Sequence, residues 1–223
     1  MRAHGRSSRE TSTPEHLMPQ RLSRIESQRT RWLWNRRIPL GGLTVIEGNP
    51  GDNKSTLMCD LAARITTGQP MPQCRRSKRP RSVLLLQGED DADTTVRPRL
   101  EAMGANVRRV FVHDKQMQAT DPTVLPDGIE TIAASIRNHR IRLVVIDPVD
   151  PFIAGSVSNG RTVREAFGPL VALAAETRTA IVAVRHLTKN SSGTNVLYQG
   201  AGSIARLLYL VCWEWDHCSG DEL

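Results

Sequence analysis

Residues 48–56, with the sequence GNPGDNKST, combine small residues that suit a tight turn with a lysine and two hydroxyl side chains. Gly48, Lys54 and Ser55 match the spacing G-x-x-x-x-G-K-[ST], in which backbone N–H groups bind phosphate oxygens. In that pattern the lysine reaches the β- and γ-phosphates, and the hydroxyl binds Mg²⁺. The sequence therefore predicts a loop that binds ATP and Mg²⁺. Its members are Gly48, Asn49, Pro50, Gly51, Asp52, Asn53, Lys54, Ser55 and Thr56.

The loop departs from the pattern at Asn53, where the spacing asks for glycine. Asn is one of the few other residues that tolerate a positive φ, so we expect the loop conformation to survive at a cost of about 1 kcal/mol. The larger side chain could instead crowd the phosphates, which leaves open a loop that binds nucleotide weakly and turns it over poorly. A chance Gly/Pro turn is the remaining alternative.

A carboxylate follows the apolar run 143–146 directly, as Asp147. A phosphate-binding loop needs such a group at the end of a neighbouring strand to hold the water shell of Mg²⁺. Ser55 and Asp147 are therefore the predicted metal ligands. The alternative is an aspartate that only caps a strand.

Two further polar residues lie just beyond apolar runs, Glu89 after 83–86 and His186 after 180–184. Hydrolysis needs a group that orients or deprotonates water, and Glu89 fits this role. His186 would face the same edge of a parallel sheet and could sense the γ-phosphate, although a lone histidine is more often structural. We therefore predict Glu89, Lys54 and His186 as catalytic residues. The acidic residues that follow are expected to cap or charge-balance the next helix: Asp90, Asp91 and Asp93.

The elements that must position these residues alternate along the chain. Continuous apolar runs predict buried strands over residues 43–46, 83–86, 110–112, 143–146 and 180–184. Helical spacing of apolar residues predicts helices over 57–65, about 93–103, 128–139 and about 162–176. Residues 68–82 are predicted to be an exposed connection and residues 113–127 a polar loop. Strands that are apolar throughout and alternate with helices indicate an α/β fold, with a parallel sheet covered on both faces.

The composition excludes several other classes. The chain has 223 residues, of which 39% are hydrophobic and 24% charged, so it is neither collagen-like nor a highly charged disordered chain. No apolar run approaches the ~18 residues of a membrane span, and no membrane partner is expected. The four cysteines are dispersed without CxxC spacing, which favours a reduced, cytoplasmic setting over disulfides or a cysteine-bound metal.

The net charge of +7 is concentrated at one end of the chain. Residues 1–40 contain nine Arg and three Glu, a net of +6, and the remaining residues contain 21 basic and 20 acidic side chains. Residues 1–30 are also poor in aliphatic side chains, so we predict a basic, disordered arm. The arm could contact nucleic acid directly or be an ordinary solvated tail. A mitochondrial presequence would also bear Arg and Ser, but Glu10 and Glu15 interrupt this segment and it has no clear amphipathic period.

Taken together, these segments resemble the RecA-like AAA-family ATPases typified by the RepA-type hexameric plasmid replicative helicases, which are related to the KaiC and DnaB groups. The resemblance covers roughly residues 32–205 and rests on five blocks in the family order. They are WLWNRRIPLGGLTVIEGNPGDNKST, SVLLLQGEDDADTTVRPRLEAMGA, LVVIDPVDPFIAG, VREAFGPLVALAAETRTAIVAVRHLTK and YQGAGSIA. The resemblance implies a Walker A motif at 48–56, a catalytic glutamate at Glu89, a Walker B aspartate at Asp147 and a switch histidine at His186. It also implies ATP and Mg²⁺ as ligands, assembly into a homo-oligomeric ring such as a hexamer, and work on single-stranded DNA in replication.

The family pattern fails after Ala205, where an arginine serving the neighbouring subunit is expected and the chain instead reads RLLYLVCWEWDHCSGDEL. Arg206 lies too early for that role, so we predict a domain at 31–205 and an aberrant tail at 206–223 that indicates C-terminal truncation. ATP binding with slow hydrolysis is then favoured over helicase activity. A truncated, nucleotide-binding but inactive relic is the alternative, and a DNA-binding module acting through the arm is the third possibility.

Overall fold

The computed structural model describes residues 19–113, 124–155 and 160–186. The chain divides into two units, Met1–Thr30 and Arg31–Leu223. In the first unit the described residues are exposed and contain one turn of 3₁₀ helix, Leu22–Arg24, in which Leu22 is 80% exposed. The predicted tail 206–223, the arginine at 206 and most of the predicted arm lie outside the described residues.

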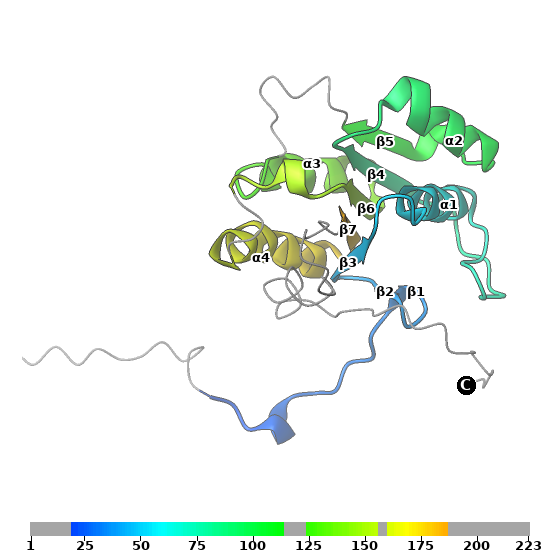
Figure 1. Ribbon diagram of the computed structural model, residues 1–223. Coiled ribbons are helices and arrows are strands. Elements are labelled where there is room, and N and C mark those ends of the chain that lie inside the picture. Colours follow the sequence, from blue (N-terminus) through cyan, green and yellow to red (C-terminus); the bar gives the residue numbers. More distant parts are fainter. Residues whose placement is uncertain (1–18, 114–123, 156–159, 187–223) are drawn as a thin grey trace, which may run out of the picture. The chain divides into compact units, whose positions relative to one another are not determined.

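The second unit is built on a parallel sheet (Figure 1). Its strands are β3 (Leu43–Gly48), β4 (Ser82–Gln87), β5 (Val110–His113), β6 (Ile141–Asp147) and β7 (Ala180–His186). They lie in the order β3-β7-β6-β4-β5, and every neighbouring pair is parallel. All five predicted strands are therefore confirmed, and each extends further than its apolar run, so that the strands end at Gly48, Gln87, His113, Asp147 and His186.

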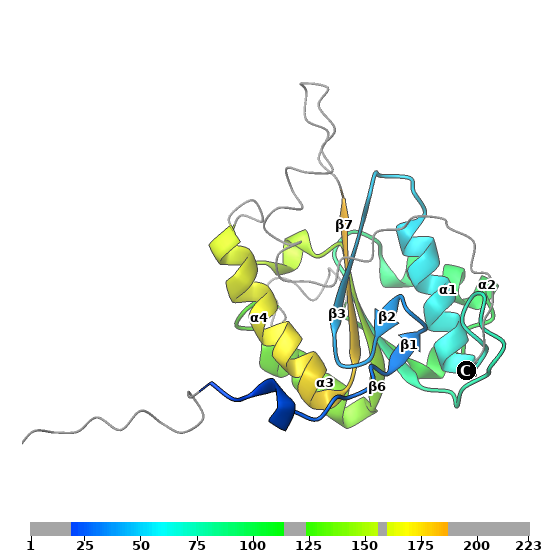
Figure 2. The ribbon, with the colours of Figure 1, turned by 90° about the horizontal axis from the view of Figure 1, so that it is seen from below.

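Helices cover the sheet on both faces, as predicted. They are α1 (Lys54–Thr67), α2 (Arg97–Ala102), α3 (Ile129–His139) and α4 (Gly160–Thr177). Figure 2 shows α1 and α2 on one side of the sheet and α3 and α4 on the other. The helix predicted over 93–103 is split, because a π-helical segment, Ala92–Val96, precedes α2.

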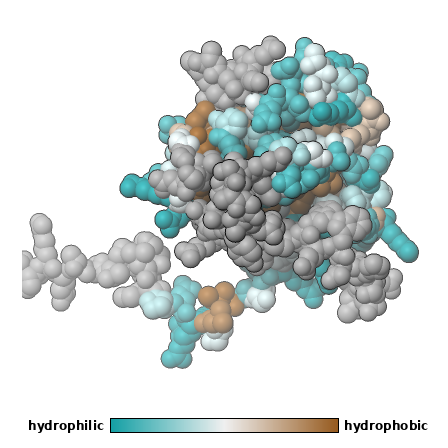
Figure 3. Space-filling view, in the orientation of Figure 1, coloured by the Kyte–Doolittle hydropathy of each residue, from teal (hydrophilic) through white to brown (hydrophobic). Residues whose placement is uncertain are grey.

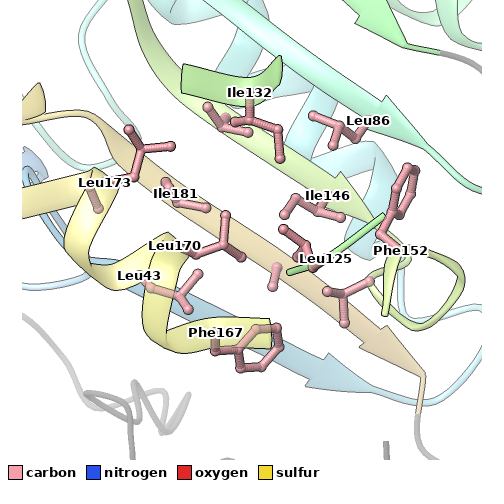
Figure 4. Close-up of a cluster of buried hydrophobic side chains, with 14 of the residues drawn as sticks. Leu43, Leu86, Leu125, Ile132, Ile146, Phe152, Phe167, Leu170, Leu173 and Ile181 are labelled. Carbon is pink, nitrogen blue, oxygen red and sulfur yellow. The ribbon is translucent and has the colours of Figure 1, made fainter. Parts of the chain in front are cut away.

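The core consists of two apolar clusters, one on each face of the sheet. In β4, Leu84 and Leu86 belong to the cluster under α3 and α4, while Val83 and Leu85 belong to the cluster under α1 and α2. Figure 4 shows the first cluster, where Phe167 and other side chains of α4 pack onto the strands. Each strand contributes to both clusters because successive side chains point to opposite faces, which is why the strands are apolar throughout.

Three features differ from the prediction. A short antiparallel hairpin, β1 (Trp32–Trp34) and β2 (Ile38–Pro39), precedes the sheet and was not predicted. The connection 68–81 is not wholly exposed, because Met71 is 5% exposed and packs in the core. Leu125, predicted to lie in a polar loop, is 1% exposed and bridges to Ile153. Short apolar segments of this kind carry no periodicity that would identify them.

The described surface is mostly hydrophilic on the face that Figure 3 shows, with only small apolar areas. No helix among the described residues is long and apolar enough to cross a membrane.

Candidate nucleotide-binding site

The register of the sheet brings the predicted polar residues to one edge. Gly48 lies opposite His186 across β3 and β7, and Gln87 lies opposite Asp147 across β4 and β6. Since β7 also pairs with β6, these four strand ends are neighbours at the carboxyl edge of the sheet. Ligands of open α/β sheets bind outside this edge.

The loop between β3 and α1 has the backbone conformation that a phosphate-binding loop requires. Asn53 has φ 57° and ψ 27°, in the left-handed region, and Gly51 has φ 90°. The predicted positive φ at Asn53 is therefore confirmed. The conformation places the loop at the N-terminus of α1, which begins at Lys54 and presents a positive dipole end.

Lys54 is only 6% exposed, although it carries a charge. Its ammonium donates hydrogen bonds to the carbonyl oxygens of Gly48 at 2.9 Å and Asn49 at 2.6 Å. These contacts hold the ammonium over the loop. A cation held there is suited to bind phosphate oxygens.

Asp52 is exposed, and its carboxylate makes a local hydrogen bond within the loop. Its Oδ2 accepts a hydrogen bond from the backbone N–H of Asn49 at 2.6 Å. A Cβ on Gly48 would lie 2.8 Å from the same oxygen, so a larger residue there would displace the Asp52 carboxylate from its present position. Asp52 thus occupies one of the N–H donors that could otherwise face a phosphate.

Asp147 is 4% exposed at the end of β6. Burial raises the pKa of its carboxyl, and a hydrogen bond from Ser55 opposes that shift. A buried carboxylate and a neighbouring serine hydroxyl provide the oxygen ligands that Mg²⁺ prefers. The observed contact brings together the two residues predicted as metal ligands.

Glu89 and His186 also meet at this edge, with 3.7 Å between Glu89 Oε2 and His186 Nε2. The Glu89 side chain is 63% exposed, so it can reach water, whereas that of His186 is 30% exposed. The backbone just before Glu89 is held by a hydrogen bond, because the Gly88 N–H donates to the Asp147 carbonyl at 3.0 Å. A Cβ on Gly88 would lie 3.0 Å from Pro151, so the turn is tightly packed.

A buried ion pair lies below this edge. Arg185, one residue before His186, has an Nη1 that lies 3.4 Å from Glu47 Oε1 and an Nε that lies 3.8 Å from Asp150 Oδ1. Burial raises the pKa of Asp150, and Arg185 opposes the shift. The pair joins β3 to β7 directly beneath the candidate site.

A pocket of about 240 Å³ collects these side chains. The predicted residues that line it are Gly51, Asn53, Lys54, Ser55, Thr56, Glu89, Asp147 and His186. Gly48, Asn49, Pro50 and Asp52 belong to the loop without lining this pocket. The predicted catalytic and metal-binding residues are thus brought together in one hollow.

Four lining residues were not predicted: Gln87, Asp90, Arg99 and Pro148. Asp90 was expected to cap a helix, but its carboxylate lies 2.6 Å from Arg99 of α2 and faces the pocket. Gln87 is the last residue of β4, which its place after an apolar run could have indicated. Arg99 has no comparable signal, because only the packing of α2 brings it to the strand ends.

A family model described as an AAA domain matches residues 9–192. The chain belongs to this AAA domain family. Its fold is that of a RecA-like P-loop ATPase domain, with the predicted phosphate-binding loop after β3. The matched segment begins before the hairpin and includes every described residue of the pocket.

One curated relative is the DNA repair protein RadA of Pseudomonas aeruginosa, which is 26% identical over 160 residues. The match spans 68% of this chain but only 29% of the RadA protein. The chain therefore covers less than a third of the relative's length.

Proposed function

We propose that this AAA domain binds ATP with Mg²⁺ and hydrolyses it to drive work on DNA or on a partner protein. The observation that carries the proposal is the pocket in which Lys54, Ser55, Glu89, Asp147 and His186 converge from four separate segments. Convergence of a cation, a hydroxyl and carboxylates at a helix N-terminus is suited to a nucleotide triphosphate and its metal.

The loop and its lysine would bind the phosphates. Lys54 would exchange its hydrogen bonds to the Gly48 and Asn49 carbonyls for phosphate oxygens. Ser55 and Asp147 would hold Mg²⁺, which when bound neutralises charge on the phosphates. The burial of Asp147 supports this role, because a desolvated carboxylate is stabilised by a cation.

Glu89 would orient the attacking water and accept its proton. Its carboxylate is exposed to solvent yet lies at the same strand edge as Lys54, which is the geometry that a general base needs. His186, 3.7 Å from Glu89, would respond to the γ-phosphate and position that carboxylate.

The test is a calorimetric titration of the full chain with ATP in the presence of Mg²⁺, followed by measurement of phosphate release. We expect saturable binding at one site per chain and a measurable turnover. An absence of binding would contradict the proposal as a whole. Binding of ATP without turnover would contradict the hydrolytic step alone.

ATP binding without turnover is the second candidate function. It is supported by the Asp52 carboxylate, which takes the Asn49 N–H and places negative charge beside the phosphate site. It is also supported by Asn53, whose side chain adds bulk where the pattern has glycine. Bound ATP that stays intact over hours would favour this candidate.

The partners are proposed from the relatives. The RadA protein is named for DNA repair, and the family resemblance suggests single-stranded DNA, a hexameric ring and a role in replication. We propose a cytoplasmic location on the same basis. Light scattering after size-exclusion chromatography with and without ATP would test ring formation, since a monomer in both conditions would exclude it.

A further inference from the structure

A second pocket, of about 510 Å³, lies at the amino ends of the strands. Arg81 precedes the first residue of β4, and Arg142 is the second residue of β6. Gln87 and Asp147, which end the same strands, belong to the candidate nucleotide site. Six strand residues at ~3.3 Å each separate the two pockets by about 20 Å, so this is a different place on the molecule.

Six cationic side chains line this pocket; Arg64 of α1 pairs with Asp60 at 2.8 Å, and the other five come from three segments. Arg31 comes from the start of the hairpin, Lys78, Arg79 and Arg81 from the connection between α1 and β4, and Arg142 from β6. Among the described residues, no carboxylate lies within 4.0 Å of any of these five cationic groups. Five of the six positive charges that line the pocket are therefore not neutralised by a carboxylate of the described part of the protein.

Neutral carbonyl groups hold two of the cations in place. The Lys78 ammonium donates to the carbonyl oxygens of Trp32 at 2.9 Å and Leu33 at 2.8 Å. Arg142 donates through Nη1 to the Arg178 carbonyl at 3.0 Å. Such contacts orient the side chains but leave their charge available to an anion.

The groups repel one another. The pKa of Arg142 is lowered by burial and also by Arg31, Arg81 and Arg178. The pKa of Lys78 is lowered by burial and by Arg142 as well. Like charges kept together without counter-charges destabilise a fold, and an anionic ligand would relieve that repulsion.

The connection that carries most of these cations is anchored rather than loose. The Trp34 indole N–H donates to the Pro72 carbonyl at 3.1 Å, and Arg37 donates to Gln73 at 3.1 Å. At the ends of the connection, the Lys78 N–H donates to Gly68 and the Arg81 N–H to Ile65. The cations are thus held in place before any ligand binds, which lowers the entropic cost of binding.

The pocket continues into a neighbouring hollow of about 450 Å³, which shares Arg81 and Arg142 and adds Arg137 and Arg140. Glu176 also lines that hollow, where it pairs with Arg137 at 3.0 Å. Because the two hollows share two arginines, they form one continuous basic surface with eight cationic side chains, which we call the basic track. A surface with that many cations suits a ligand that carries a row of negative charges rather than a single phosphate.

We propose that the basic track binds the phosphodiester backbone of a single-stranded nucleic acid, and that Trp32 stacks on one base. Guanidinium groups bind phosphate oxygens in pairs, and a basic groove with an aromatic side chain is the usual combination for single strands. Trp32 lines the first pocket and is half-buried, so its ring is fixed beside the cations. The proposal does not depend on ATP hydrolysis.

The test measures binding of a fluorescent 20-nucleotide oligothymidine to the full chain, without nucleotide, at several salt concentrations. The double variant Arg79→Gln/Arg81→Gln removes two exposed charges from the track. Arg161→Gln/Arg164→Gln removes two exposed charges from α4, one of them paired with Glu165, and serves as a control with the same change in net charge. We expect the track variant to bind about tenfold more weakly, with a salt slope smaller by about 1.4, since each single-strand phosphate contact contributes about 0.7. The control should match the parent chain.

Two further binding experiments identify the ligand. An abasic oligomer of the same length should bind about fivefold more weakly than oligothymidine, because it offers no base to Trp32. Vesicles of phosphatidylglycerol should compete poorly with the oligonucleotide. Circular dichroism melting curves of both double variants should match the parent, since the substituted side chains are exposed.

Three results would overturn the proposal. Equal weakening in both double variants would mean that only net charge matters. Unchanged binding in a folded track variant would assign any affinity to another segment, such as the basic arm at 1–30. Binding to vesicles but not to oligonucleotide would make the track a lipid-binding surface.

Discussion

The two ends of the sheet carry different charges although the same strands build them. At the carboxyl edge, Lys54 and Arg99 share a pocket with Glu89, Asp90 and Asp147. At the amino edge, the pocket has five cations that no described carboxylate neutralises. A site for a triphosphate and a divalent metal needs both signs of charge, whereas a site for a polyanion needs only positive charge. The difference in charge matches the two kinds of phosphate recognition that we propose for the two edges.

The largest expected effect is on turnover, at the carboxyl edge. Glu89→Gln removes the proposed base while keeping size and hydrogen-bonding ability, so phosphate release should fall by about 10²–10⁴-fold. ATP affinity should change little, as a titration with Mg²⁺ would show. Asp91→Asn is the matched control, because that carboxylate is exposed and does not line the pocket. Equal loss in both variants would remove Glu89 from the mechanism.

The next effect is on nucleotide affinity. Lys54→Ala removes the buried ammonium, so ATP binding should weaken by about 100-fold, since hydrogen bonds to charged groups contribute about 1.5–3 kcal/mol each. Arg164→Ala on the surface of α4 should bind ATP like the parent chain. Binding of oligothymidine should be unchanged in both variants. If Lys54→Ala also abolished oligothymidine binding without unfolding, the two ends would not be independent sites.

A smaller and opposite change is expected at Asp52. Asp52→Asn keeps an oxygen that can accept the Asn49 N–H but removes the negative charge, so ATP should bind about fivefold more tightly at low salt. The gain should shrink as salt is added, because exposed charges are screened. Titrations at several salt concentrations measure both effects. Tighter binding that does not depend on salt would mean that loop geometry, not charge, limits affinity.

The smallest effect concerns stability. At Asn53, φ is 57°, so Asn53→Ala should lower the free energy of unfolding by about 1 kcal/mol more than Asn53→Gly. Asn138 lies in α3, where alanine is favoured over glycine. Asn138→Gly should therefore have a lower free energy of unfolding than Asn138→Ala, by up to about 1 kcal/mol. Urea denaturation of the four variants measures both differences. The same order at both positions would argue that backbone strain is absent from the loop.

Much of the carboxyl edge could be predicted because local chemistry marks it. Glycine, lysine and serine at fixed spacing follow an apolar run, and Glu89, Asp147 and His186 each lie at the end of another such run. Parallel strands present these ends at one edge, so their convergence followed from the fold class. The positive φ at Asn53 also followed, since few other side chains tolerate it.

The amino edge could not be predicted in the same way. The connection over residues 68–82 was expected to be exposed, and its arginines resembled ordinary solvated charges. The proposed role of these arginines in binding an anion depends on Arg31 and Arg142. These two residues lie far away in the sequence and line the same pocket only after folding. The β1–β2 hairpin that anchors the connection was missed as well, because its strands are too short for a periodic signal.

The sequence by itself determined the α/β class, the five strands, and the residue types gathered at the carboxyl edge. It could do so because periodicity and strand-end positions are local properties of the chain. The tertiary structure decided that Arg99 and Asp90 line the candidate nucleotide pocket and that the cations at the amino edge share one basic track. Those outcomes depend on which strands become neighbours and on the carboxylates around each cation, and neither is encoded within a short stretch of residues.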